Sequence, residues 1–158
     1  MKDGSVILIA EDDTSHFALM KKNLWRCCVH NDIVHFCDGR ELLDFLFMRG
    51  NGPKMVPGTS YLLLLDINLS KITGIDVLRQ IKSDQQLRKM PVIMLTLSDS
   101  QQQDVQKCYE LGCNFFIHKP DNYNDFMQCV DQFGTFLSLP DIALPEIGVP
   151  SSIKGQNN

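Results

Sequence analysis

Five short apolar runs, each followed by a segment of helical periodicity, constrain the fold of this chain more than any other feature. Continuous apolar runs are typical of strands that a parallel sheet buries on both faces. Right-handed crossovers then favour a doubly wound sheet. The pattern predicts an α/β protein with a (βα)5 flavodoxin-like parallel sheet of strand order 2-1-3-4-5. The expected strands are 5–10, 32–37, 61–65, 91–96 and 114–118, and the expected helices are 14–27, 38–50, 74–84, 100–112 and 122–139.

The helix boundaries and the domain boundary follow from capping residues and prolines. Thr14 is positioned to cap the first helix, and Gly50 and Gly112 are expected to end the second and fourth. Residues 1–139 are predicted to form a single domain. The remaining segment, 140–158, carries Pro140, Pro145 and Pro150 at intervals of five, so it is predicted to be extended or disordered and hardly helical.

Composition and charge exclude several classes of protein. The chain has 158 residues and a net charge of −4, which argues against a general nucleic-acid binder. No apolar run approaches the roughly 18 residues of a membrane span, and the N-terminus does not read as a signal peptide, so a cytoplasmic protein is expected. The six cysteines lack a C-x-x-C pair and zinc spacing, which indicates reduced thiols used as small buried hydrophobes.

Polar residues follow the strands that flank the predicted switch point of the sheet. Glu11 and Asp12 follow the first strand, Asp66 the third, Thr96 ends the fourth, and Lys119 follows the fifth. Any one of them alone is typical of a turn or a helix cap. Together they converge on one edge, where the carboxylates would repel one another unless a hard cation such as Mg²⁺ bound them. Such a site suits phosphoryl transfer, with Asp66 as nucleophile.

These residues and their spacing resemble the receiver domain of two-component response regulators over about residues 5–139. Thirty positions separate Asp66 from Thr96, and twenty-three separate Thr96 from Lys119, which Pro120 follows. The resemblance implies that Asp12 ligates Mg²⁺ directly and that Glu11 does so mainly through water. It also implies ligation by one oxygen of Asp66 and by the backbone carbonyl of Asn68.

The resemblance further implies a switch driven by phosphorylation. Asp66 would accept a phosphoryl group from the phosphohistidine of a sensor histidine kinase, forming an aspartyl phosphate. Lys119, aimed by a cis peptide bond to Pro120, would pair with the phosphoryl group. Thr96 would move to donate a hydrogen bond to it, and Phe116 would turn inward as Thr96 moves. The fourth helix, fifth strand and fifth helix would form the output face.

Longer stretches narrow the resemblance to the small response regulators that partner cyanobacterial phytochromes. These stretches are "NGPKMVPG", "LRQIKSDQQLRKMPVIMLT" and "CYELGCNFFIHKP". The narrower resemblance implies a stand-alone receiver that signals through protein contacts, without a DNA-binding module, and that forms a homodimer through the output face. Leu97 departs from the family, which usually has a small residue there, and we expect it to shade Asp66 and slow autodephosphorylation.

Three other functions fit parts of the sequence. A flavin-binding electron carrier would share the topology, but "EDDTSH" after the first strand would repel a flavin phosphate. A phosphatase with an aspartyl intermediate usually has a second acid where Asn68 stands, so turnover of external substrates is not expected. A pseudo-receiver that binds partners without phosphorylation is the main alternative, and the intact set of site residues argues against it.

Overall fold

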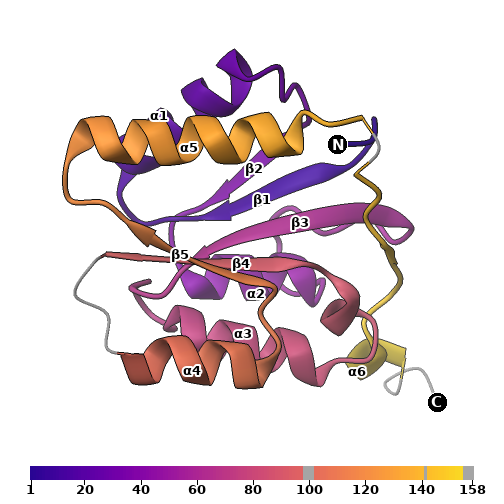
Figure 1. Cartoon of the computed structure of the whole chain (residues 1–158). Helices are drawn as coiled ribbons and strands as arrows, with labels where there is room; N and C mark the ends of the chain where they lie inside the picture. The colour runs from indigo at the N-terminus through magenta and orange to yellow at the C-terminus, as the bar shows by residue number, and fades with distance from the viewer. Residues whose placement is uncertain (98–101, 141, 155–158) are drawn as a thin grey trace.

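Six strands and six α-helices form the part of the protein that this computed structural model describes, residues 1–97, 102–140 and 142–154. The parallel strands have the order β2-β1-β3-β4-β5, which confirms the predicted fold class (Figure 1). The strands are β1 (Val6–Ala10), β2 (Ile33–Phe36), β3 (Thr59–Asp66), β4 (Val92–Leu97), β5 (Phe115–Lys119) and β6 (Glu146–Ile147). The helices are α1 (Thr14–Arg26), α2 (Gly39–Leu46), α3 (Gly74–Ser83), α4 (Gln102–Leu111), α5 (Tyr123–Leu137), α6 (Ser151–Lys154) and the short 3-10 helix η1 (Leu87–Lys89).

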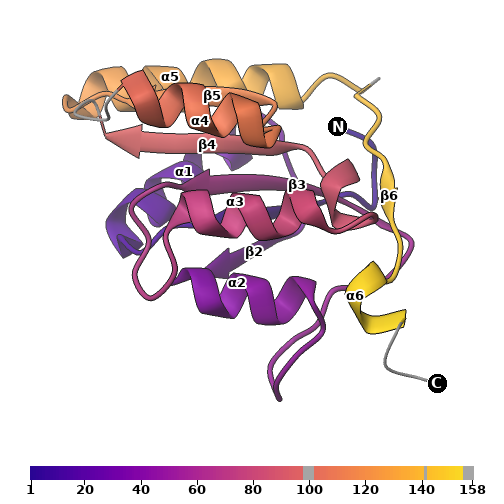
Figure 2. The same cartoon turned by 90° about the horizontal axis from the view of Figure 1, so that it is seen from below.

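Helices cover both faces of the sheet, which is why its strands are continuously apolar. Helices α1 and α5 lie on one face and α2, α3 and α4 on the other (Figures 1 and 2). Successive side chains of a strand point to opposite faces. Leu63 and Leu65 of β3 accordingly join the core beneath α2 and α3, whereas Leu62 and Leu64 join the core beneath α1 and α5. The apolar run of β3 thus fills two cores and holds its terminal residue, Asp66, at the centre of the sheet.

The capping residue of α1 and the end of α2 differ from those predicted. Asp13, not Thr14, caps α1, because its carboxylate accepts hydrogen bonds from the backbone N–H groups of Ser15 at 2.8 Å and His16 at 3.1 Å. Helix α2 ends at Leu46 and not at Gly50. Met48 has a φ of 56°, in the left-handed region, so the backbone has already left the helix before the glycine is reached.

The C-terminal segment is docked on the domain at the end of the sheet opposite the carboxyl ends of the strands (Figure 1). Its extended course fits its prolines, and β6 pairs antiparallel with the start of β3, where Ile147 is fully buried. The helical turn α6 was not expected. It forms because Asp84 accepts hydrogen bonds from the Ser151 hydroxyl at 2.7 Å and the Ser152 N–H at 3.2 Å, which fixes the start of the turn.

A close approach of α3 to β3 fixes the loop that follows Asp66. A Cβ atom on Gly74 would lie 2.1 Å from the carbonyl oxygen of Asp66 and 2.8 Å from the Cα of Ile67. The Gly74 N–H donates to the Ile67 carbonyl at 2.8 Å. Only glycine permits this contact, so the sequence of the helix start sets the position of the strand end.

The cysteines are free thiols, but only some of them serve as buried hydrophobes. Cys108 and Cys113 are buried, Cys27 and Cys129 are half-buried, and Cys28 and Cys37 are exposed. Burial raises the pKa of the Cys108 thiol to about 11, so this thiol is protonated at neutral pH. Within the described ranges, no helix has the length and apolar character needed to cross a membrane.

Candidate functional site

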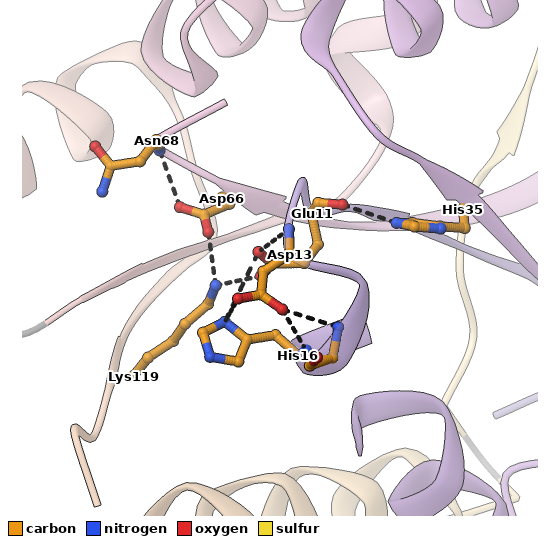
Figure 3. A network of polar contacts seen from close by, with 8 residues as sticks. Glu11, Asp13, His16, His35, Asp66, Asn68 and Lys119 are labelled. Atoms are coloured by element: carbon orange, nitrogen blue, oxygen red, sulfur yellow. Dashed lines mark hydrogen bonds and ion pairs between the residues drawn. The ribbon is translucent and has the colours of Figure 1, made fainter. Parts of the chain in front are cut away.

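Three strands deliver charged side chains to one point at the carboxyl edge of the sheet. Glu11 follows β1, Asp66 ends β3 and Lys119 ends β5. The Lys119 ammonium donates a hydrogen bond to Oδ2 of Asp66 at 2.6 Å and a second one to Oε2 of Glu11 (Figure 3). The predicted convergence of these three residues is confirmed, and it occurs beside the switch point between β1 and β3.

The three side chains are almost completely removed from solvent, with side-chain exposures of 1% for Glu11, 6% for Asp66 and 2% for Lys119. Burial raises the pKa of the Glu11 carboxyl, and the Lys119 ammonium offsets only part of that effect. Burial opposes the charged form of Lys119, but the carboxylates of Asp66 and Glu11 outweigh it and raise the pKa of the ammonium. The buried cluster therefore carries more acid than its one lysine can neutralise.

Asp12 completes a cluster of oxygen donors on the exposed side of this ion pair. Ligand atoms of Glu11, Asp12 and Asp66 all lie within 4.8 Å of one another, and Asp12 alone of the three is exposed. Carboxylate oxygens at this spacing suit a hard divalent cation, which keeps several waters and needs one or two carboxylates. A cation entering from the side of Asp12 would stabilise the ionised form of Glu11, which burial disfavours and which Lys119 stabilises only in part.

The loop after Asp66 brings Asn68 into the site. The Asn68 N–H donates to Oδ1 of Asp66 at 2.9 Å, while Oδ2 of Asp66 is held by Lys119. The acceptor carboxylate is therefore oriented from both sides. This hydrogen bond also places the backbone of Asn68, whose carbonyl was predicted as a metal ligand, next to the acidic cluster.

Thr96 lies on β4, the strand beside that of Asp66, and Phe116 lies on β5, one strand further out. Thr96 is buried and directly follows Leu95, the residue that pairs with Asp66 across β3 and β4. Phe116 is half-buried against the core beneath α2 and α3. Both residues lie on the strands on which the sequence analysis predicted them. Their predicted movement stays a prediction.

The peptide bond before Pro120 differs from the one expected. The Lys119–Pro120 peptide bond is trans, so the expected cis bond is wrong for this structure. A trans bond is the form that X–Pro normally prefers, by roughly 0.5–1 kcal/mol, and Lys119 reaches both carboxylates without the cis form. The predicted shading of Asp66 by Leu97 concerns a side chain outside the described part of the structure.

Two histidines at the site were not identified from the sequence. Nδ1 of His16, in the first turn of α1, lies 3.9 Å from Oε1 of Glu11. Nε2 of His35, in β2, lies 2.7 Å from the carbonyl oxygen of Glu11. The position of His16 one turn after the acidic residues offered a weak signal. Nothing in the sequence pattern of β2 distinguished His35 from an ordinary strand residue.

Comparisons with known proteins agree with this geometry. The family described as response regulator receiver domain matches residues 7–131. A crystal structure of a response regulator receiver domain from Rhodospirillum rubrum is 39% identical, covers 90% of this chain and 99% of that chain, and superposes with a TM-score of 0.82.

Two further solved structures are similar over most of their length. The Mn²⁺-bound form of response regulator Rcp1 is 33% identical, with 89% of this chain and 99% of that chain covered and a TM-score of 0.78. Rcp1 of Synechocystis is also matched by sequence, at 32% identity over 143 residues, which is 89% of this chain and 92% of Rcp1. The phosphorylated cyanobacterial phytochrome response regulator RcpA is 32% identical, with 90% and 99% covered and a TM-score of 0.76.

Proposed function

This chain belongs to the family of response regulator receiver domains, and we propose that it accepts a phosphoryl group on Asp66. The observation that carries the proposal is the fixed carboxylate at the tip of β3. One oxygen is held by the Lys119 ammonium, and the other faces the N–H of Asn68. A carboxylate oriented in this way beside further acids suits attack on phosphorus.

The proposed metal is Mg²⁺, bound by Asp12, by Glu11 mainly through water, by Asp66 and by the carbonyl of Asn68. The carboxylate cluster within 4.8 Å supports a divalent cation at this place. The similar protein Rcp1 has been solved with Mn²⁺, which supports the same class of ion. When bound, the cation would neutralise charge on the phosphoryl oxygens.

In the proposed transfer, an oxygen of Asp66 attacks the phosphorus of a phosphohistidine. The new O–P bond forms as the N–P bond breaks, and the imidazole nitrogen leaves with the electron pair of that bond. The Lys119 ammonium, already 2.6 Å from Asp66, would pair with the transferred group. Thr96 would donate its hydroxyl hydrogen to a phosphoryl oxygen, and Phe116 would then turn inward. The chain would be a phospho-acceptor and would not turn over external substrates.

The proposed output face lies on α4, β5 and α5. Four aromatic side chains of the described residues of these elements are exposed, namely Tyr109 at 48%, Phe115 at 59%, Tyr123 at 58% and Phe136 at 51%. Exposed aromatic residues of this kind are enriched at protein interfaces. We propose that a homodimer forms through this face, and that the signal passes on through protein contacts without nucleic acid.

The proposed phosphodonor is a sensor histidine kinase of the phytochrome type acting in the cytoplasm. The support is the likeness to RcpA, described as a cyanobacterial phytochrome response regulator and solved in phosphorylated form.

Phosphotransfer in vitro tests the proposal. The full chain is incubated with phosphorylated sensor kinases and Mg²⁺, and label on the chain is followed over time. We expect label on the wild type and on Asp76→Asn, a control at an exposed carboxylate on α3, and none on Asp66→Asn. Label on Asp66→Asn, or no label on the wild type with any phosphodonor, would overturn the assignment and favour the pseudo-receiver.

A further inference from the structure

The His35 side chain connects three elements at the edge of the site. Its ring stacks on Phe17 of α1, with centroids 3.7 Å apart and planes 3° from parallel. Its Nε2 lies 2.7 Å from the carbonyl oxygen of Glu11 (Figure 3). Since a carbonyl only accepts hydrogen bonds, Nε2 must carry the hydrogen in this contact.

The hydrogen bond from His35 to the Glu11 carbonyl lies just beyond the last paired residues of β1 and β2. Ala10 and Phe36 are the last paired residues, and the Glu11 N–H still donates to the Phe36 carbonyl at 3.1 Å. Beyond that point the chain after β2 turns away toward α2, which Asp38 caps. The His35 ring supplies a donor to the Glu11 carbonyl at this position, so β2 holds Glu11 by both its N–H and its carbonyl group.

The acidic turn, residues 11–13, is also fixed on the side of α1. The Asp13 N–H donates to Oε1 of Glu11 at 3.1 Å, and the Asp13 carboxylate caps α1. The Phe17 N–H donates to the Asp13 carbonyl at 3.0 Å, so the residue that stacks on His35 belongs to the same capped turn. Asp12 lies between these two anchors, and it is the exposed member of the carboxylate cluster.

We propose that His35 is a positioning residue that preorganises the turn of residues 11–13 for a divalent cation. The inference rests on the metal site of the proposed function. Without the His35 hydrogen bond, the Glu11 carbonyl loses its anchor on β2, and binding the cation must pay the entropy of ordering the turn. Metal affinity should therefore depend on the ring nitrogen of His35 and not on its stacking.

Two substitutions at position 35 separate these contributions. His35→Phe keeps an aromatic ring on Phe17 and removes the donor, whereas His35→Gln places an amide N–H near the position of Nε2 and removes the ring. Phe17→Leu is a matched control that removes the stacking from the other side. Calorimetric titration of each full-length variant with Mg²⁺ and Mn²⁺ gives the affinities, and thermal unfolding without metal reports the loss of packing.

We expect His35→Phe to bind either cation about five-fold more weakly than the wild type, the size typical of one lost hydrogen bond. His35→Gln and Phe17→Leu should bind within about two-fold of the wild type, even where their unfolding temperatures fall. Weak binding by His35→Gln or Phe17→Leu with wild-type affinity in His35→Phe would overturn the proposal, as would equal affinities in all variants.

Amide hydrogen exchange of the metal-free protein provides a readout that is independent of the proposed function. His35→Phe should speed exchange at residues 11–16, and His35→Gln should restore the wild-type rate. A wild type that binds neither cation would contradict the proposed function, while these exchange rates would still decide whether His35 orders the turn. Unchanged exchange in His35→Phe would contradict the positioning role.

Discussion

At the scale of single residues, the two ion pairs of Lys119 hold the site together. Its buried ammonium contacts two buried carboxylates, so removing it leaves two acids without their shared cation. Unpaired charge in a buried site is far more costly than an unpaired charge at the surface. A bound divalent cation would take over part of the charge compensation that Lys119 provides.

Lys119→Met should therefore destabilise the metal-free protein and make its stability depend on Mg²⁺. We expect a loss of about 3–5 kcal/mol in the free energy of unfolding at pH 7, the size typical of breaking a buried ion pair. Added Mg²⁺ should restore a larger part of the unfolding free energy in this variant than it adds to the wild type. Urea unfolding with and without Mg²⁺ measures both effects.

Lys71→Met provides the matched control. Lys71 also pairs with a carboxylate, Asp38, at 2.6 Å, but its side chain is 64% exposed. We expect a loss of about 1 kcal/mol or less, with no dependence on Mg²⁺. Equal losses from the two substitutions would contradict a buried site in which Lys119 is the shared cation of two carboxylates.

At the scale of secondary-structure elements, Asp84 joins the C-terminal segment to the domain. Its carboxylate accepts four hydrogen bonds, from Gln86, Leu87, Ser151 and Ser152, and it thereby holds the start of η1 against the start of α6. Burial disfavours the charged form, but these hydrogen bonds outweigh it and hold the pKa of Asp84 below its ordinary value. A carboxyl group of this kind contributes stability above its unfolded pKa and loses that contribution as the pH falls through its folded pKa.

Asp84→Asn should thus destabilise the protein at pH 7 and have little effect in acid. We expect a loss of roughly 1–3 kcal/mol at pH 7, the range for hydrogen bonds to a charged group. The difference from the wild type should shrink as the pH falls below the ordinary aspartate value of 3.8. Urea unfolding across this pH range measures it. Asp76→Asn removes an exposed carboxylate whose pKa is also lowered, by Arg79 and Thr73, so its loss should show the same pH dependence but be smaller than that of Asp84→Asn. A pH-independent loss in Asp84→Asn would contradict the argument.

The elements also show which features the sequence could predict. The five parallel strands, their order and the convergence of Glu11, Asp66 and Lys119 follow from local patterns, because parallel strands bring their carboxyl ends to one edge. The docking of α6 depends on a hydrogen bond between Asp84 and Ser151, which lie 67 residues apart. No local pattern encodes such a contact.

The role of His35 was missed for the same reason. A histidine in an alternating strand is unremarkable until the stacking partner on α1 and the free end of the ladder are seen together. The wrong expectation at Pro120 has a different origin. The cis bond was expected from the family resemblance alone, and no local sequence pattern predicted it.

At the scale of the whole molecule, the fold separates three regions in space. The acidic site lies at the carboxyl edge of the sheet, the docked C-terminal segment at the opposite end, and the exposed aromatics on α4, β5 and α5 (Figures 1 and 2). β5 connects the first and third of these regions, because it carries Phe115 at its start and Lys119 at its end. A change around Lys119 therefore has a short path to the proposed dimer face.

Removing an aromatic side chain from that face should weaken the proposed dimer. Phe115→Glu places a charge at the start of β5 on this face, and we expect its dimer dissociation constant to rise by about ten-fold or more. Trp25→Glu is the control, because Trp25 is 68% exposed but lies on α1, away from the face. Sedimentation of the full chain with and without phosphorylation measures both, and a wild type that stays monomeric at high concentration would contradict the dimer.

The central claim is that Asp66 is the residue that carries the phosphoryl group. Mapping of that group by mass spectrometry tests it most directly, after transfer from a kinase to the intact wild-type chain and chemical trapping of the acyl phosphate. We predict a single modified residue, Asp66, and no transfer to it when EDTA removes the cation before the kinase is added. A phosphoryl group mapped to any other residue, or transfer that proceeds equally well without a divalent cation, would contradict it.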